Sequence, residues 1–474
     1  MKTTTISRFA QAALLIIFML AKSTVYSQTL PDSTDYNYAA FRFPDIDRKA
    51  LNAQFGLFGT ASRFEQRQTT LPSDNRQSTF ANNLNLSYSR FRNTEKLQAL
   101  RLVSFGHSFS SSRTRSDVSL NRNTQFNVGL GINDLHRHYY KPQRFWAYQL
   151  LVATTFQKSS QRRDNPIFTQ KSWEFDLNAS LPLKIGKGRI EPIDDVFIAK
   201  FMMDDLMENG ILNADLSQEQ LFSLGQVMAA ARNQRIFDGR RQRIYELTQL
   251  DNWFKENGLT ESKSDMLYFT TVADNWLFSF RNVRSAGERY AVGAAPFALF
   301  NHFRDFAPGI SKGHFGISVF GEYDNERPIN QFWQVEKRAR AGVEYLNNPV
   351  DANDGLYNEW LRPFAEASLG YGYFPNSRTI VLADASLRYE YYIGADNNVF
   401  DFDYHVIQPE IRLEATYFVN YQFRITGALN GSYFWSSDNA DGAVFPSFEL
   451  PFSINSGNRG FNFSSNVSLL YSFF

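Results

Sequence analysis

The chain contains 474 residues, carries a formal net charge of +1 and has no cysteine. The lack of cysteine excludes disulfide bonds and thiolate metal sites, and the near-neutral charge gives no indication of a nucleic-acid partner. Hydrophobic residues make up 43% of the chain and the mean hydropathy is −0.38, as in a soluble protein, but 16% of the residues are aromatic. A transmembrane β-barrel can have such a low mean hydropathy, because the polar residues on the inner faces of its strands offset the apolar residues on the lipid-facing side. A secreted soluble β-protein is the alternative to a transmembrane barrel.

Residues 1–27 have the organisation of a secretory signal peptide. Two basic residues precede an apolar run over 12–21, and small or moderate side chains follow at the positions expected for cleavage before Gln28. The apolar run is shorter than the roughly 20 residues that a membrane-spanning helix needs. We therefore predict export of the mature chain, without a lipoprotein anchor because no cysteine follows the cleavage position.

Residues 28–187 contain stretches in which apolar and polar side chains alternate. Alternation with a period of two places the two sets on opposite faces of a strand. In the last stretch, Trp173, Phe175 and Leu177 begin a continuous apolar face. We interpret this range as the first part of a β-barrel, with long polar loops and with strands at 50–64, 80–92, 97–110, 124–133, 144–157 and 168–185.

Between residues 188 and 260 the apolar period changes from 2 to 3.6, which indicates helices. The first begins near Asp194, whose charge favours the positive end of a helix, and stops near Gly210. Ser217 opens a second helix with a capping box, and Asp238 caps a third. We predict an inserted segment of three amphipathic helices that bury their apolar faces against each other or against the barrel.

Five arginines gather around the start of the third helix. Guanidinium groups bind carboxylates and phosphates well, so this cluster predicts a surface that docks an acidic periplasmic protein or polymer. A solvated helix face, or pairing with Asp204, Asp205 and Glu208, is the alternative. The cluster consists of Arg232, Arg235, Arg240, Arg241 and Arg243.

Residues 261–474 form the second part of the barrel and contain the clearest strands, at 335–345, 361–373, 380–393, 410–420 and 423–435. Each carries charged residues on one face and aliphatic or aromatic residues on the other over about ten residues, which is typical of transmembrane strands. A soluble sandwich could show the same alternation, but aromatic residues near the strand ends favour membrane interfaces. The charged faces predict a lumen lined by Arg338, Arg340, Glu344, Glu366, Asp384, Arg388, Glu390, Glu410, Arg412, Glu414 and Arg424.

The last fourteen residues, Phe461–Phe474, alternate between apolar or aromatic and polar side chains. This segment resembles the closing strand of Gram-negative outer-membrane β-barrel proteins, and Tyr471-Ser472-Phe473 matches the Tyr-x-Phe ending of that family, with Phe474 one residue extra. The helical insert resembles one found in a group of uncharacterised outer-membrane barrels. The resemblance implies an integral place in the cell outer membrane, contact with its lipid, and recognition of Tyr471, Phe473 and Phe474 by the barrel-assembly machinery.

The pattern and the resemblance together predict an all-β transmembrane antiparallel barrel of about 14 strands, with 12 and 16 as alternatives. Single-chain bacterial barrels have even strand numbers and keep their short turns in the periplasm. Counting from the N-terminus places the insert at 188–260 in the periplasm, whereas counting back from the C-terminus gives an odd strand total. A lumenal or outer position is the alternative.

Three functions from different classes are compatible with this sequence. We prefer a channel or transporter-like conduit with a narrow, charge-lined lumen, for which a salt-bridged barrel interior is the structural alternative. The second is a structural or export-associated barrel whose insert docks periplasmic partners. The third, an outer-membrane enzyme, is disfavoured because no catalytic residue set can be assembled, and we expect no metal or cofactor. His136 and His138, spaced to chelate a metal, are interpreted as part of a turn at the membrane interface.

Overall fold

The computed structural model describes residues 36–471 except 67–72, 116–119, 165–166, 214, 235, 237, 260–265, 278–283, 306–309, 348–358, 396–402, 420–422 and 437–458. The predicted signal peptide, Arg235, Phe473 and Phe474 therefore lie outside the described residues. Tyr471 is the last residue of the final strand.

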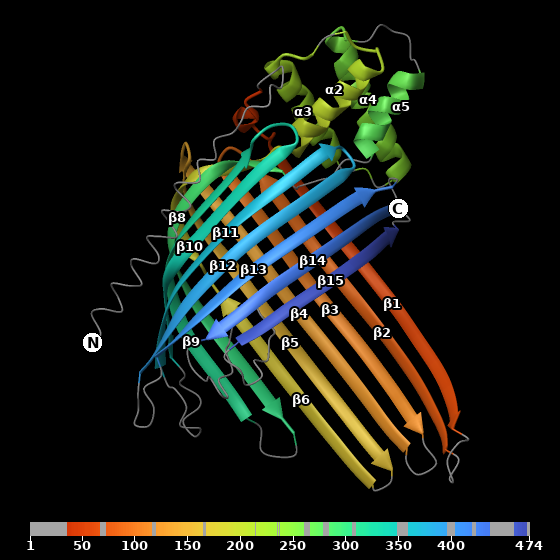
Figure 1. The fold of residues 1–474 in the computed structure, drawn as a ribbon, viewed down its shortest axis with the longest axis vertical. Coiled ribbons are helices and arrows are strands. Elements are labelled where there is room, and N and C mark those ends of the chain that lie inside the picture. Colours follow the sequence, from red (N-terminus) through yellow and green to blue (C-terminus); the bar gives the residue numbers. More distant parts are fainter. Residues whose placement is uncertain are drawn as a thin grey trace.

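The described strands form one antiparallel sheet in which consecutive strands are hydrogen-bonded neighbours, except for β6 and β7 (Figure 1). The strands are β1 (Ile46–Gln66), β2 (Ser73–Asn93), β3 (Leu97–Arg115), β4 (Leu120–Lys141), β5 (Arg144–Asp164), β6 (Ile167–Ser180), β7 (Leu183–Pro192), β8 (Ser285–Arg304), β9 (Ile310–Pro328), β10 (Trp333–Asn347), β11 (Glu359–Asn376), β12 (Thr379–Ala395), β13 (Asp403–Phe418), β14 (Phe423–Ser436) and β15 (Arg459–Tyr471). In the described part of the chain, β1 and β15 are the two edges of the sheet.

Two of these strands share one position in the wall. Both β6 and β7 pair with β5 and with β8, but each pairs with a different half of those partners. Leu181 and Pro182 separate them, and proline cannot donate a ladder hydrogen bond. The path through the strands that the structure describes therefore has 14 positions. This confirms the predicted fold class of an antiparallel β-barrel with about 14 strands and a helical insert.

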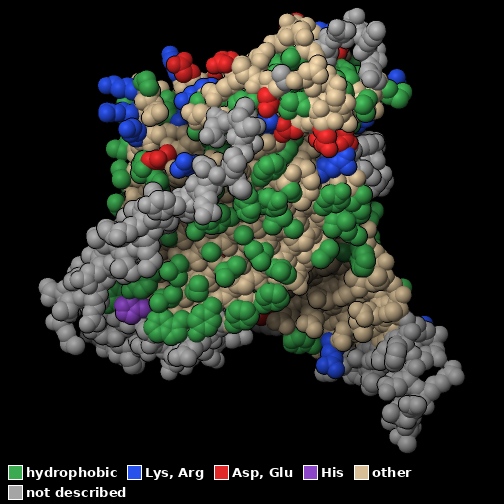
Figure 2. Space-filling model, turned by 45° about the horizontal axis from the view of Figure 1, so that its top comes forward, with side chains coloured by type: hydrophobic (Ala, Val, Ile, Leu, Met, Phe, Trp, Pro, Cys, Tyr) green, Lys and Arg blue, Asp and Glu red, His purple; other side chains and the backbone are tan. Residues whose placement is uncertain are grey.

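The outer face of the wall is apolar. Val292, Val319 and Ile411 are 58%, 58% and 59% exposed, and they lie at the alternating positions that point away from the barrel. Apolar side chains form a broad band over the strands, whereas charged side chains gather at the end that carries the helices (Figure 2). A continuous apolar surface of this extent is costly in water, so it fits lipid rather than the outside of a soluble sandwich.

The inner face carries aromatic side chains packed against glycines. The Phe320 ring lies 3.2 Å from the position of a Cβ added to Gly293, and a Cβ added to Gly342 would collide with the Val319 carbonyl oxygen and with the Cα and Cβ of Phe320. Phe320 also packs with Phe364 in a small buried cluster. Glycine lets a twisted sheet bend sharply, and the ring restores the packing that the missing side chain would have provided. These rings narrow the interior beside β7–β11.

Among the described residues, four α-helices follow β7, namely α2 (Asp194–Glu208), α3 (Gln218–Asn233), α4 (Gly239–Glu256) and α5 (Met266–Leu277). The first three lie within the range predicted for the insert, with the capping box at Ser217 and the cap at Asp238 present as predicted. The structure differs at both borders: β7 continues to Pro192, and α5 occupies residues that we assigned to the barrel. None of the described helices is long and apolar enough to cross a membrane.

The helices share a core with the segment that precedes β1. Met202, Leu224 and Phe254 are fully buried, and Tyr38 of the short 3-10 helix η1 (Tyr38–Ala40) and Phe41, which follows it, pack into the same cluster. The Tyr38 ring stacks on Phe197 of α2, with ring centroids 4.3 Å apart. The insert is therefore a small folded body with its own hydrophobic core.

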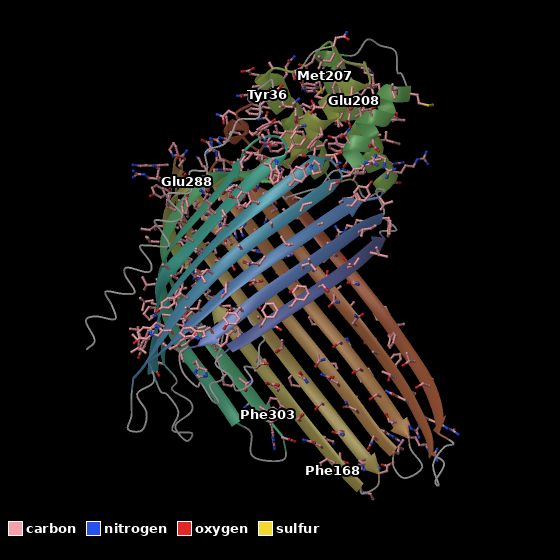
Figure 3. The ribbon with its side chains drawn as sticks, in the orientation of Figure 1. Tyr36, Phe168, Met207, Glu208, Glu288 and Phe303 are labelled. Atoms are coloured by element: carbon pink, nitrogen blue, oxygen red, sulfur yellow. The ribbon has the colours of Figure 1, made fainter. Side chains whose placement is uncertain are left out.

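The insert lies at one end of the barrel (Figure 1). Apart from the insert, the strand connections at this end are two to four residues long, at 94–96, 142–143, 329–332, 377–378 and 419–422, whereas those at the other end range from two residues at 165–166 to 22 residues at 437–458. Tyr36, Met207 and Glu208 lie at the helical end, and Phe168 and Phe303 lie at the opposite end (Figure 3).

Candidate functional site

The structure places all eleven residues predicted to line the lumen at even-numbered positions of β10–β14, opposite to the exposed apolar residues of the same strands. In the register, Arg340 lies between Glu322 and Glu366, and Glu366 lies between Arg340 and Arg388. Asp384 faces Arg412 on the next strand. Charges of opposite sign therefore alternate around this wall, which favours cross-strand attraction.

A buried ionic network lies within this face. Arg362 of β11 donates to Glu344 of β10 at 2.7 Å and to Glu390 of β12 at 3.1 Å. Arg388 donates to the same carboxylate oxygen of Glu390 at 2.6 Å, and the Tyr392 hydroxyl donates to the other at 2.8 Å. The side chains of Arg362 and Glu390 are 7% and 8% exposed. Such a network is stable because each buried charge has a partner of opposite sign.

A second charged group continues across β7–β10. Lys184 contacts Glu322 at 2.7 Å, and Arg289 contacts Asp324 at 2.6 Å. The guanidinium of Arg340 stacks over the Phe320 ring at 4.3 Å from its centroid. Ion pairs and aromatic rings thus occupy the same stretch of the inner wall, and the cation–π contact holds Arg340 against it.

Other predicted residues are much more accessible. Arg338 pairs with Glu336 at 2.9 Å and Arg412 with Glu414 at 2.6 Å, but the two arginine side chains are 56% and 55% exposed. Arg424 is exposed and sits beside the turn between β13 and β14. The inner face is therefore uneven, with a dry part around Arg362 and solvent-accessible positions at Arg338 on β10 and on β13 and β14.

Several members of the network were absent from the sequence-based prediction, namely Lys184, Arg289, Glu322, Asp324 and Arg362. Arg362 lies in the predicted strand 361–373 at the parity of Glu366, and Lys184 lies in the predicted strand 168–185 on the face opposite to its apolar residues, so the alternation already placed both on polar faces. Arg289, Glu322 and Asp324 lie on β8 and β9, which were not among the predicted strands.

Arg284 attaches the insert to the barrel. Its guanidinium donates to the carbonyl oxygens of Gln331 at 2.5 Å and Asn330 at 3.0 Å, in the turn between β9 and β10. It also lies over the ring of Phe197 in α2, 3.2 Å from the centroid. The Arg284 backbone N–H donates to Asp194 at the start of α2. Burial lowers the pKa of the Arg284 guanidinium to about 9, so the group remains charged at neutral pH.

Three further contacts join the helices to the short turns. Gln331 donates to Asp204 of α2 at 2.6 Å, and Arg378, in the turn between β11 and β12, forms an ion pair with Asp274 of α5. The rings of Phe201 and Phe332 lie 6.1 Å apart. Contacts to two separate turns fix the insert against the rim of the barrel.

The predicted arginine docking cluster is divided by the structure. Arg232 is buried, with its guanidinium 3.2 Å from Asp195 and 4.3 Å from the centroid of the Trp276 ring. Its assignment to a docking surface is therefore wrong, because α2 and α5 cover it. Arg240, Arg241 and Arg243 are exposed on α4.

His136 and His138 lie within β4 rather than in a turn. His136 stacks on Tyr148 and His138 on Trp146, with ring centroids 4.9 Å and 4.3 Å apart, on the outward face near the helical end. His136 also contacts Asp134 at 2.9 Å. This is an aromatic belt of the kind that forms at a membrane interface. Among the described residues, no three His, Asp or Glu side chains are placed to hold a metal ion.

Neither a known protein family nor a curated protein matches this sequence. Among solved structures, the chain is similar to the translocator domain of the autotransporter NalP from Neisseria meningitidis, with 9% identity, a TM-score of 0.25, and coverage of 74% of this chain and 84% of that one. A deltaS2 mutant of the TodX monoaromatic hydrocarbon channel has 7% identity, a TM-score of 0.26 and coverage of 82% and 84%. OccAB1 from Acinetobacter baumannii has 8% identity, a TM-score of 0.24 and coverage of 92% and 100%.

Proposed function

We propose that this protein is an outer-membrane conduit for small polar solutes, with a narrow, charged lumen and a helical insert that restricts one mouth. The observation that carries the proposal is the exposure of inward-facing charged side chains. Arg338 and Arg412 point to the inside of the wall and still expose more than half of their side-chain surface. Water therefore has room beside them, as expected for an aqueous path rather than for a fully packed interior.

The buried network around Arg362 and the rings around Phe320 support a constriction along this path. Because the lining charges have both signs and are largely paired, the conduit is expected to discriminate by size more than by charge. Ion pairs that span β10, β11 and β12 also stabilise the wall, so the same residues serve structure and passage.

The proposed orientation places the helices in the periplasm. Apart from the insert, every strand connection at the helical end has at most four residues, whereas the long connections 348–358, 396–402 and 437–458 lie at the other end, and barrels of this kind keep short turns on the periplasmic side. With 14 strand positions, β1 begins and β15 ends at this same end (Figure 1). The insert is then positioned to restrict entry from the periplasm.

Planar-bilayer conductance of the refolded chain tests the proposal. Pro192 and Ser285 face each other in the register of β7 and β8, so a two-residue Asn-Gly hairpin can replace residues 193–284. The full chain should give small or intermittent current steps, and the deletion should give larger, longer openings. If both proteins fold, as judged by their heat-dependent gel mobility, and both remain electrically silent, the conduit proposal fails.

The exposed arginines on α4 favour a second candidate, a barrel whose insert docks an acidic periplasmic protein or polymer. Arg240, Arg241 and Arg243 would carry this interaction. Replacing all three by glutamine should abolish capture of an acidic polymer such as polyglutamate by the purified full chain. Unchanged capture would exclude α4 as the docking surface.

A further inference from the structure

A row of basic side chains crosses the outward face of the barrel at the end remote from the helices. Arg113 of β3 lies directly opposite Arg122 of β4, and Arg122 lies directly opposite Arg162 of β5. All three are exposed. Phe168, which faces the neighbour of Arg162 in the register of β5 and β6, marks this end in Figure 3.

This arrangement is unfavourable for the barrel by itself. Like charges directly opposite each other on adjacent strands repel, and here the repulsion is repeated across three strands. Asp164 contacts Arg162 at 3.1 Å, but this carboxylate lies at the edge of the row, beside one arginine of the three. Lys158, Lys171 and Arg304 on β5, β6 and β8 extend the positive surface. An anion bound along the row would relieve the repulsion.

An aromatic girdle lies on the same face, nearer the helical end of the strands than the basic row. The rings of Phe80 and Phe109, of Phe126 and Phe156, and of Phe156 and Trp173 are 6.2–6.4 Å apart, which makes a nearly continuous band across β2–β6. Such bands mark the boundary between acyl chains and headgroups. Arg113 and Arg122 each lie four residues beyond the girdle, or about 13 Å along the strand.

We propose that this basic row, consisting of Arg113, Arg122 and Arg162, binds the phosphate of a lipid headgroup in the adjacent leaflet. The girdle holds the acyl chains, and the guanidinium forks hold the phosphate oxygens. The assignment of this leaflet as the outer one rests on the orientation given with the proposed function, whereas the binding itself rests only on the row and the girdle.

The test measures lipid retained on the full chain by native mass spectrometry, with dioctanoyl phosphatidic acid as the probe. Dioctanoylglycerol, which differs only by lacking the phosphate, and inorganic phosphate alone are the comparison ligands. Each basic residue near a membrane surface contributes about fivefold to binding of anionic lipid. Replacing the three arginines of the row by glutamine should therefore weaken retention of phosphatidic acid about 100-fold.

Arg163→Gln is the matched control, because Arg163 is exposed on the same strand at the same end but points to the opposite face. It should retain phosphatidic acid as wild type does. Phosphatidic acid should also raise the unfolding temperature of the wild type and leave that of the triple variant unchanged. If the triple variant does not fold, Arg122→Gln, at the centre of the row, should weaken retention about fivefold.

Three results would overturn the proposal. Dioctanoylglycerol bound as tightly as phosphatidic acid would remove the role of the phosphate. If Arg163→Gln and Arg122→Gln lost equal amounts of bound phosphatidic acid, the binding would depend on the net charge of the protein and not on the basic row. Inorganic phosphate bound as tightly as the lipid would identify a site for a free anion. The lipid-binding test does not depend on conductance. A protein that conducts no current but binds phosphatidic acid would contradict the conduit proposal and support the lipid site.

Discussion

Replacing Arg284 by methionine should release the insert from the barrel rim without unfolding the barrel. The variant keeps an unbranched apolar side chain near Phe197 but loses the donors to Gln331, Asn330 and Gln334. Hydrogen bonds from a charged group contribute about 1.5–3 kcal/mol each, and the two short ones dominate. Relief of the cost of burying the guanidinium offsets part of this loss, so we expect the insert to dock about 3 kcal/mol less stably.

Hydrogen exchange of the folded protein in detergent measures this change directly. A loss of about 3 kcal/mol corresponds to roughly 100-fold faster exchange for amides protected by docking, in α2 and in the turn between β9 and β10. Amides of β2–β4, remote from Arg284, should exchange as in the wild type. Arg240→Met, on the exposed surface of α4, is the control and should change nothing. Unchanged exchange of α2 in the Arg284 variant would refute the attachment of the insert to the barrel through Arg284.

Three further predictions concern the wall and the insert. Arg362→Met leaves Glu344 and Glu390 buried without their common partner, so the barrel should lose about 3–5 kcal/mol, measured by urea-dependent gel mobility; an unchanged midpoint would mean that the network is not buried. Gly342→Ala should slow or prevent folding because its Cβ meets backbone atoms, whereas Gly427→Ala, with nothing near, should fold normally. Burial raises the pKa of the Asp205 carboxyl group, so the folded insert binds a proton at this group more tightly than the unfolded chain does. The insert therefore gains stability as the pH falls through the raised pKa. Asp205→Asn should therefore be the more stable form near pH 7, by a margin that shrinks on acidification; a constant margin would contradict the assignment.

The alternation of side chains was sufficient to predict the strands that have water on one side and lipid on the other. In β13, Ile411 and Leu413 point outward and Arg412 points inward, so the two faces differ in every step. The same rule fails in β8, because its inner face is also apolar: Ala295 and Phe297 are buried inside while Val292 is exposed outside. A strand with two apolar faces has no period of two to detect.

The errors in the insert have a different origin. In α5 the buried residues Tyr268, Val272 and Trp276 recur every four positions, but their aromatic and β-branched side chains favour strands as much as helices. Arg232 shows most clearly what the sequence pattern cannot predict. Its partners Asp195 and Trp276 come from two other helices, and only the tertiary packing reveals that the side chain is buried.

The central claim is that ions pass through the lumen and that the docked insert restricts this passage. The most direct test uses the chain without native cysteines, with Asp274→Cys and Arg378→Cys joined by a reducible thiol cross-linker across the existing ion pair. In a planar bilayer, the cross-linked protein should show suppressed current, and reduction of the linker should restore openings in the same molecules. Currents that do not change on cross-linking and reduction would contradict restriction by the insert, and an absence of current in both states would contradict the conduit.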